Sequence, residues 1–317
     1  MHRYVLKRLL LMIPVILGVS FLVFCIMDMA PGDAVDLMAP EGATAEDLEV
    51  IRHELGLDRP VVIRYVEYMF NMLHGDLGIS YVSKTDVFDT YVEKLPATIK
   101  LSFASIFVSI ILSVPLGIYS ATKQGTIQDN ISMILAMIGL SMPNFWLGLL
   151  LIIVFSLKLG WFPSGGDETF LSIVLPAFTI GTGLMATLTR TTRSSMLDVL
   201  KQEYLRTARA KGIRERVVIT SHALRNALIP IITIIGTQLA GVLGGSVLTE
   251  TVFAWPGVGR LIVDSLNMRD TPLVTGSIIM TTILLSIILL LVDLLYAVVD
   301  PRIKAQYVTK RGKKKNG

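Results

Sequence analysis

The most chemically distinctive stretch of the chain runs from Glu203 to Gly212 and reads Glu-Tyr-Leu-Arg-Thr-Ala-Arg-Ala-Lys-Gly. Its cations Arg206, Arg209 and Lys211 can orient a partner by charge complementarity, but a basic loop of this kind is not a catalytic site. The stretch His222-Ala-Leu-Arg-Asn-Ala-Leu-Ile-Pro230 follows it. We therefore expect a docking surface for a soluble partner that supplies energy from outside the chain.

The segment between Arg190 and Asn226, here called the docking segment, is predicted to form two short helices. Four residues recur at helical spacing: Leu197, Leu200, Tyr204 and Ala208. Gly212 is expected to stop the first helix in a left-handed conformation, and the second is expected over 215–225. The small Ala208 and Ala210 would let a partner approach closely. The alternative is a solvated basic hairpin. The residues assigned to docking are Glu203, Tyr204, Arg206, Thr207, Ala208, Arg209, Ala210, Lys211 and Gly212.

The sequence predicts no cofactor or metal bound by this chain. His222 is one of four histidines, and no second histidine, cysteine or paired carboxylate lies at metal spacing from it. The single cysteine, Cys25, lies in an apolar run and is interpreted as a packing residue. The motif Gly-x4-Gly-Lys-Ser/Thr is absent, so no P-loop for ATP is predicted.

Composition places the docking segment within a membrane protein. Hydrophobic residues make up 52% of the 317 residues and charged residues only 17%, with a mean hydropathy of +0.64. Uncharged runs of about 18–20 residues can cross a bilayer, where every backbone amide must be paired internally, so such runs are helices. We predict an all-α membrane protein with six transmembrane helices. They are Leu9–Met27, Leu101–Thr122, Ile131–Leu157, Phe170–Thr189, Ala227–Thr249 and Pro272–Val292.

The distribution of charge predicts the orientation. The tail 1–8 has three Lys or Arg residues and no acid, 190–226 has nine basic and three acidic residues, and 300–317 has seven and one. The segment 28–100 has six basic and fourteen acidic residues. Because basic residues accumulate on the cytoplasmic side, both termini and the docking segment are expected inside. The net charge of +4 then reflects a basic membrane-protein face and not nucleic-acid binding.

Four segments are expected along the chain. They are a tail and first span (1–30), an external helical subdomain (31–97), a five-helix core (98–300) containing the docking segment within 190–226, and a basic tail (301–317).

The external subdomain carries signals for three helices. Thr44-Ala-Glu-Asp47 is typical of a helix start, with Gly56 as the stop. Pro60 is expected to open a second helix that ends at Gly75, and a third is expected over Asp86–Leu95. The subdomain either caps the helix bundle or meets a delivery protein.

Asp293 is the one acid inside the last apolar run. Carboxylates within membrane segments are usually paired or functional. Structural pairing near the interface and a transport role both remain open for Asp293.

The docking segment resembles the cytoplasmic coupling loop of ABC-importer permeases of the peptide-type subfamily, which favours Glu/Asp-Tyr-x-Arg-Thr-Ala-Arg-Ala-Lys-Gly. The resemblance extends from the first residues to about Arg302. It includes Arg8-Leu-Leu-Leu-Met-Ile-Pro-Val-Ile-Leu-Gly-Val-Ser20, Ala30-Pro-Gly-Asp33, Leu55-Gly-Leu-Asp-Arg-Pro60, Gly75-Asp-Leu-Gly78, Pro143-Asn-Phe-Trp-Leu-Gly148, Leu159-Gly-Trp-Phe-Pro163, Thr251-Val-Phe-Ala-Trp-Pro-Gly-Val-Gly-Arg260 and Asp293-Leu-Leu-Tyr-Ala-Val-Val-Asp-Pro-Arg302. One departure is that Arg206 occupies the Glu position of the general permease pattern Glu-Ala-Ala-x3-Gly.

The resemblance implies a type I importer permease in a bacterial or archaeal cytoplasmic membrane. Two permease subunits would form the pathway, and two ATPase subunits holding ATP and Mg would grip the coupling loops. An extracytoplasmic binding protein would deliver the solute. The chain itself would be a non-catalytic transport subunit. Di- or oligopeptides are the expected solutes, with nickel, glutathione or another small solute as alternatives.

Two other classes remain to be separated from this one. A self-sufficient secondary transporter usually shows inverted repeats and midplane ionisable or broken-helix sites, and the first five spans show neither. A membrane scaffold without transport is the third interpretation. The sequence assigns no substrate-binding residue.

Overall fold

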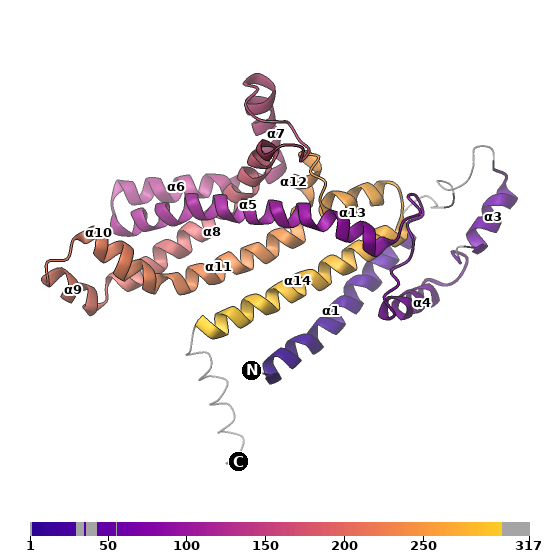
Figure 1. Ribbon diagram of the computed structural model, residues 1–317, viewed down its shortest axis with the longest axis horizontal. Helices are drawn as coiled ribbons and strands as arrows, with labels where there is room; N and C mark the ends of the chain where they lie inside the picture. The colour runs from indigo at the N-terminus through magenta and orange to yellow at the C-terminus, as the bar shows by residue number, and fades with distance from the viewer. Residues whose placement is uncertain (1, 30–34, 36–42, 55, 300–317) are drawn as a thin grey trace, which may run out of the picture. The chain divides into compact units, whose positions relative to one another are not determined.

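The computed structural model describes residues 2–29, 35, 43–54 and 56–299. Among these residues no strand forms, and Ile79 and Asp86 make an isolated antiparallel bridge. The all-α prediction is confirmed. In chain order, with the α-helices labelled in Figure 1, the helices are α1 (His2–Met29), α3 (Ala45–Glu54), α4 (Val61–Leu73), α5 (Val87–Thr122), α6 (Ile127–Ser141), α7 (Asn144–Leu151), the π-helical turn η1 (Ile152–Lys158), the 3₁₀ turn η2 (Phe170–Ile173), α8 (Val174–Leu200), α9 (Glu203–Ala210), α10 (Glu215–Val217), the π-helical turn η3 (Val218–Ala223), α11 (Leu224–Gly245), α12 (Val247–Val252), α13 (Val258–Asn267) and α14 (Thr271–Val299).

Five helical segments are long and apolar enough to span a membrane, or six if a bent pair counts as one span. The bent pair corrects the predicted third span, Ile131–Leu157, because α6 and the α7–η1 segment meet at 96°. Met142 is extended (φ −100°, ψ 129°) and Pro143 follows it before α7. A proline disfavours helical conformation in the residue before it, and it has no N–H to continue the ladder.

Two further helix boundaries differ from the predictions. The short external helix expected over Asp86–Leu95 is the first part of α5, which continues through Pro96 and Pro115 to Thr122. The fifth span ends at Gly245 and not at Thr249, which belongs to α12. In the first case Pro96 was expected to separate two helices but lies inside one, and in the second the apolar run continues past the end of the helix.

The chain divides into two compact units, residues 1–100 with 243–286 and residues 101–242 with 287–317. The helices α5, α11 and α14 each contribute to both. The predicted segments 1–30, 31–97 and 98–300 follow chain order and stay a prediction. The basic tail 301–317 and the motif Ala30–Asp33 lie outside the described residues, as does the side chain of Asp293, so its two interpretations stay open.

The predicted starts and stops of the first two external helices are confirmed. The Asp47 amide donates to Thr44 Oγ1 (3.3 Å), and Asp47 Oδ2 accepts from the Thr44 amide (2.9 Å), forming a cap for α3. Thr44 Oγ1 also donates to Asp47 Oδ2 at 2.7 Å, and the hydrogen bonds that the carboxylate accepts from the Thr44 amide and hydroxyl lower the pKa of Asp47. Gly56 (φ +65°) and Gly75 (φ +88°) follow α3 and α4 in the left-handed region.

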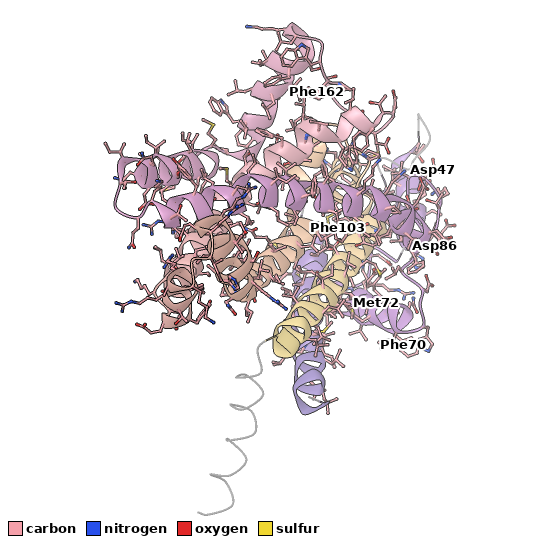
Figure 2. The ribbon with its side chains drawn as sticks, turned by 60° about the vertical axis from the view of Figure 1, so that its left-hand side comes forward. Asp47, Phe70, Met72, Asp86, Phe103 and Phe162 are labelled. Carbon is pink, nitrogen blue, oxygen red and sulfur yellow. The ribbon has the colours of Figure 1, made fainter. Side chains whose placement is uncertain are left out.

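Helix α4 packs against α1 in this first unit. Phe24 of α1 contacts the rings of Tyr65 and Tyr68, and Tyr65 Oη donates to the Leu17 carbonyl oxygen at 2.9 Å. Figure 2 shows Phe70 and Met72 on α4. Met72 packs on the buried cluster of Leu77, Val87 and Leu273.

A buried carboxylate organises the segment between α11 and α13. Glu250 is fully buried and accepts hydrogen bonds from Thr98 Oγ1 (2.9 Å), Ser246 Oγ (2.7 Å) and the Arg260 amide (3.1 Å). A Cβ on Gly257 would collide with this carboxylate and with Thr98. The stretch Thr251–Arg260, which includes the end of α12 and the start of α13, therefore packs around Glu250.

Candidate partner-docking surface on α9

Helix α9 is set apart from α8 by a turn at Lys201 and Gln202 and ends at Ala210. The Gly212 amide donates to the Arg209 carbonyl oxygen (2.9 Å), and the Ile213 amide donates to that of Ala208 (3.3 Å). Gly212 adopts φ +75°, so the predicted left-handed stop is confirmed. Seven of the ten residues from 203 to 212 are polar or glycine, so α9 depends on a few apolar contacts for its position.

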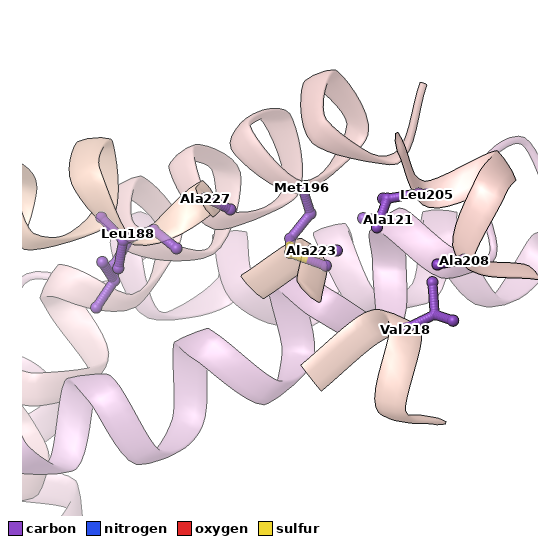
Figure 3. Packing of buried hydrophobic residues seen from close by; sticks show 9 residues of the cluster. Ala121, Leu188, Met196, Leu205, Ala208, Val218, Ala223 and Ala227 are labelled. Atoms are coloured by element: carbon purple, nitrogen blue, oxygen red, sulfur yellow. The ribbon is translucent and has the colours of Figure 1, made fainter. Parts of the chain in front are cut away.

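Those contacts come from one buried face of α9. Leu205 is fully buried and Ala208 is 9% exposed, and both belong to the main apolar cluster of the second unit. Figure 3 shows Leu205 beside Ala121 of α5 and Ala208 beside Val218 of η3. The other members of the cluster are Leu188, Met196, Ala223, Ala227 and Ile231. Ala208 therefore faces its own chain, in contrast to the expectation that it faces a partner, whereas Ala210 is exposed.

The opposite face of α9 is polar and open to solvent. The exposed residues among those assigned to docking are Glu203, Tyr204, Arg206, Thr207, Arg209, Ala210, Lys211 and Gly212. Arg209 forms a two-point ion pair with Glu215, with Nε–Oε2 at 3.0 Å and Nη2–Oε1 at 2.9 Å. This hydrogen bonding raises the pKa of the Arg209 guanidinium above its ordinary value. Arg206 forms no ion pair within the described part of the chain.

A second set of hydrogen bonds ties α9 to the start of α11. Asn226 Nδ2 donates to Tyr204 Oη at 2.7 Å and to the His222 carbonyl oxygen at 3.0 Å. His222 thus contributes its backbone to the loop. The positioning roles of Asn226, Glu215 and Leu205 were not predicted from the sequence. Leu205 was recognisable as the one large aliphatic residue of α9, whose other residues are polar or alanine.

The second predicted helix is not a separate one. The segment expected over 215–225 consists of α10 and η3, which lead directly into α11, so that the structure has one long helical segment from Glu215 to Gly244. On the other side, residues 190–200 of the predicted loop are the last turns of α8. The exposed part of the predicted loop is therefore residues 201–217, here called the docking hairpin, with α8 leading into it and η3 and α11 following it.

An ion pair lies near the base of this hairpin, between α6 and α8. Asp129 accepts from Arg193 through Nε–Oδ1 (2.8 Å) and Nη2–Oδ2 (2.7 Å). Ser120 Oγ and the Gly125 amide also donate to the carboxylate. The Asp129 side chain is 4% exposed and that of Arg193 is 27% exposed. The pair fixes α8 to the α5–α6 turn seven residues before α8 ends.

Replacing Leu205 by alanine is expected to lower the free energy of unfolding by about 2–5 kcal/mol, the usual cost of removing a buried leucine side chain. Because Leu205 holds α9 in place, trypsin should also cleave after Arg206 faster than in the wild type. Val217→Ala is the matched control, since Val217 is an apolar residue of the same hairpin and is 41% exposed. Its expected cost is within about 0.5 kcal/mol. Equal effects of the two changes would show that Leu205 is not an anchor.

Comparison with known proteins gives two family matches. The family described as "Binding-protein-dependent transport system inner membrane component" matches residues 113–305. The family described as "Binding-prot-dependent transport system membrane comp, N-term" matches residues 1–102. Together the two matches include the docking hairpin and the external segment.

Curated relatives match over nearly the whole length. The chain is 43% identical over 315 residues to the oligopeptide transport system permease protein AppB of Bacillus subtilis (strain 168), with 96% of this chain and 100% of that protein covered. It is 42% identical over 304 residues to the glutathione transport system permease protein GsiC of Escherichia coli (strain K12), with 96% and 99% covered.

A solved structure of the MetNI methionine ABC transporter in an inward-facing conformation has the same fold. The TM-score is 0.57 at 18% sequence identity, over 67% of this chain and 96% of that chain. At this identity the likeness concerns the fold alone, and it confirms the importer-permease architecture predicted from the sequence.

Proposed function

The chain belongs to the family of binding-protein-dependent transport system inner membrane components, and on that premise we propose that it translocates di- or oligopeptides and is driven through α9 by ATPase subunits. It is a permease subunit of a peptide-type ABC importer and resides in the inner membrane. The observation that carries the coupling proposal is the two-faced character of α9. Its buried face is fixed by Leu205 and its exposed face is cationic.

Peptides are proposed as substrates because relatives named for oligopeptide and glutathione transport match at similar identity. Glutathione, itself a small peptide, is the second candidate. Nickel remains the alternative suggested by the sequence resemblance. A self-sufficient secondary transporter is disfavoured by the family match. The expectation that the first five spans contain no broken helix is wrong, because α6 and α7 are separated by a sharp bend.

The proposed assembly contains a second permease subunit, two ATPase subunits that bind ATP and Mg, and a solute-binding protein. The chain itself is proposed to be non-catalytic and to need no cofactor of its own. With both termini cytoplasmic, α9 faces the ATPases, and residues 43–86 face the binding protein. Co-elution of two ATPases and a second permease from mild detergent supports this assembly, whereas a chain that transports alone contradicts it.

The mechanism proposed for α9 follows from its attachments. Nucleotide-driven closure of the ATPases moves the exposed face of α9, and the buried side chains of Leu205 and Ala208 pass that movement to α5, α8 and α11. Such coupling needs a rigid-body transition between two states. The Tyr204–Asn226 hydrogen bond makes α9 move together with α11.

The substrate class is tested by uptake in cells lacking this chain and in restored cells. Labelled dipeptide, a longer peptide, glutathione and nickel are compared. Loss of peptide entry that the restored gene reverses is the expected result. Loss of nickel entry alone would indicate that the chain imports nickel and not peptides.

Replacing Arg206 by glutamate is expected to reduce peptide uptake about tenfold or more. The partner surface is expected to complement a cation at this position, so an anion there would place like charges together, which costs several kcal/mol. Membrane levels of the chain should not change. Lys123→Glu makes the same charge change at the exposed α5–α6 turn and should leave uptake intact.

The change Arg209→Glu is harder to interpret, because it also breaks the ion pair between Arg209 and Glu215. If Arg209 acts only through that ion pair, adding Glu215→Arg should restore peptide uptake.

A further inference from the structure

A cavity of about 650 Å³ lies in the unit formed by residues 1–100 and 243–286. Its walls come from α3, α4, the loop 74–86 and the first turns of α14. This volume is within the range of small-molecule sites, which are about 300–1,000 Å³. No residue of α9 lines this cavity, so the proposed coupling leaves it without a role.

The cavity wall carries charges of both signs. Lys84 is exposed, and no carboxylate pairs with it in the described part of the chain. The other wall cation, Arg64, is already bound to Asp28 at 2.7 Å. Asp76 and Glu54 are wall carboxylates with no cation partner among the described residues. The wall therefore offers a free cation and free carboxylates to one ligand.

Two buried hydroxyl groups on the same wall have no hydrogen-bond partner among the described residues. Thr275 is fully buried, and both its Oγ1 and Tyr68 Oη are unpartnered. Buried polar groups are nearly always hydrogen-bonded, and exceptions call for an explanation such as a ligand. Burial, with a smaller contribution from Asp76, raises the pKa of Tyr68, so its phenol remains a neutral donor. Asn71 adds an amide to this side of the wall.

The loop that carries Lys84 is held in advance of any ligand. Asp270 accepts hydrogen bonds from Ser80 Oγ and from the amides of Tyr81 (3.1 Å) and Val82 (3.3 Å), and it is 1% exposed. Lys84 itself has φ +59°, a conformation that non-glycine residues seldom adopt and that is enriched at functional sites. A site fixed in this way loses less conformational entropy when a ligand binds.

We propose that this cavity is a binding site for a short zwitterionic peptide, with the peptide carboxylate at Lys84 and its ammonium at Asp76. Peptide groups between the termini would meet Asn71 and the Tyr68 hydroxyl. A divalent metal fits less well, since the described residues contain no group of three His, Cys, Asp or Glu side chains able to share one. The proposal rests on peptide import as the function and adds a recognition site on the permease itself.

The test measures binding of labelled trialanine to the purified full chain in nanodiscs. Lys84→Gly removes the cation and also suits the positive φ, so it should not impair folding. It is expected to weaken trialanine binding about tenfold or more, as for loss of a charge-assisted hydrogen bond. Trialanine amide, which lacks the carboxylate, should bind the wild type and Lys84→Gly equally. N-acetyl-trialanine should likewise be insensitive to Asp76→Asn, which keeps the acceptor for the Gly78 amide.

The matched control is Arg269→Gly. Arg269 is also a cation at positive φ (+53°) in the same unit, but it does not line the cavity. Its replacement should leave trialanine affinity unchanged. Absence of saturable trialanine binding, or equal losses for the acid and the amide, overturns the site. If the complex imports peptides while the chain binds none, the site fails and the function stands. If the binding pattern holds but no peptide is imported, the function fails and the site stands.

Discussion

Replacing Arg193 by alanine is expected to destabilise the chain by about 3–5 kcal/mol, the cost of leaving one partner of a buried ion pair alone. The Asp129 carboxylate is 4% exposed and loses both of its hydrogen bonds to the guanidinium. Ser120 and the Gly125 amide still donate to it, but neither supplies a positive charge. Unfolding in mixed micelles, followed by the loss of helical circular dichroism, measures the change.

An exposed pair provides the control for this prediction. Arg59 and Glu67 form an ion pair at 3.0 Å, and each side chain is 54% exposed. Arg59→Ala should cost no more than about 1 kcal/mol, because solvent screens such pairs. The double change Arg193→Met with Asp129→Asn should recover much of the loss, since it removes the buried charge and keeps an acceptor for the Gly125 amide. Similar losses for the Arg193 and Arg59 variants would contradict a buried role for Asp129.

Much of the fold follows from patterns local in the sequence. Runs long enough to cross the hydrocarbon core located the spans, and Thr44, Gly56 and Gly75 located the helix ends outside the membrane. The break in the third span was not predicted, because hydropathy averages over a window and does not register a single bend. Proline alone does not decide the matter either, since Pro115 lies inside the continuous α5 while Pro143 lies in the break between α6 and α7.

The sequence predicted which residues of the candidate site form a helix, but not which face of that helix is exposed. Residues 203–212 were correctly expected to form a helix that stops at Gly212. Which side of that helix faces the chain depends on contacts with α5, η3 and α11, and the α5 contact, Ala121, is distant from α9 in sequence. The Asp129–Arg193 pair joins residues 64 positions apart, and Glu250 accepts from Thr98 across 152 positions. No local pattern contains such pairings.

The end of α9 in the docking hairpin depends on the left-handed backbone conformation of Gly212. A Cβ at this position would meet nothing within 4 Å, so a side chain there has space. Its φ of +75° is the obstacle, since an L-residue in the left-handed region costs roughly 1–2 kcal/mol. A β-branched residue such as valine is the least able to adopt this positive φ. The strain would favour conformations in which the amides of Gly212 and Ile213 no longer close the end of α9, and the exposed face would then point elsewhere.

Gly212→Val is therefore expected to reduce peptide uptake about tenfold, the population change that roughly 1–2 kcal/mol produces. The amount of chain in the membrane should stay the same, since no core contact is lost. Gly212→Asn should retain most uptake, because asparagine tolerates the left-handed region. Gly166→Val is the matched control, with φ +79° and open space at Cβ in a loop away from the hairpin. It should show a similar loss of stability with normal uptake. If Gly166→Val and Gly212→Val reduce uptake equally, the strain acts on folding in general, and α9 has no special part in coupling.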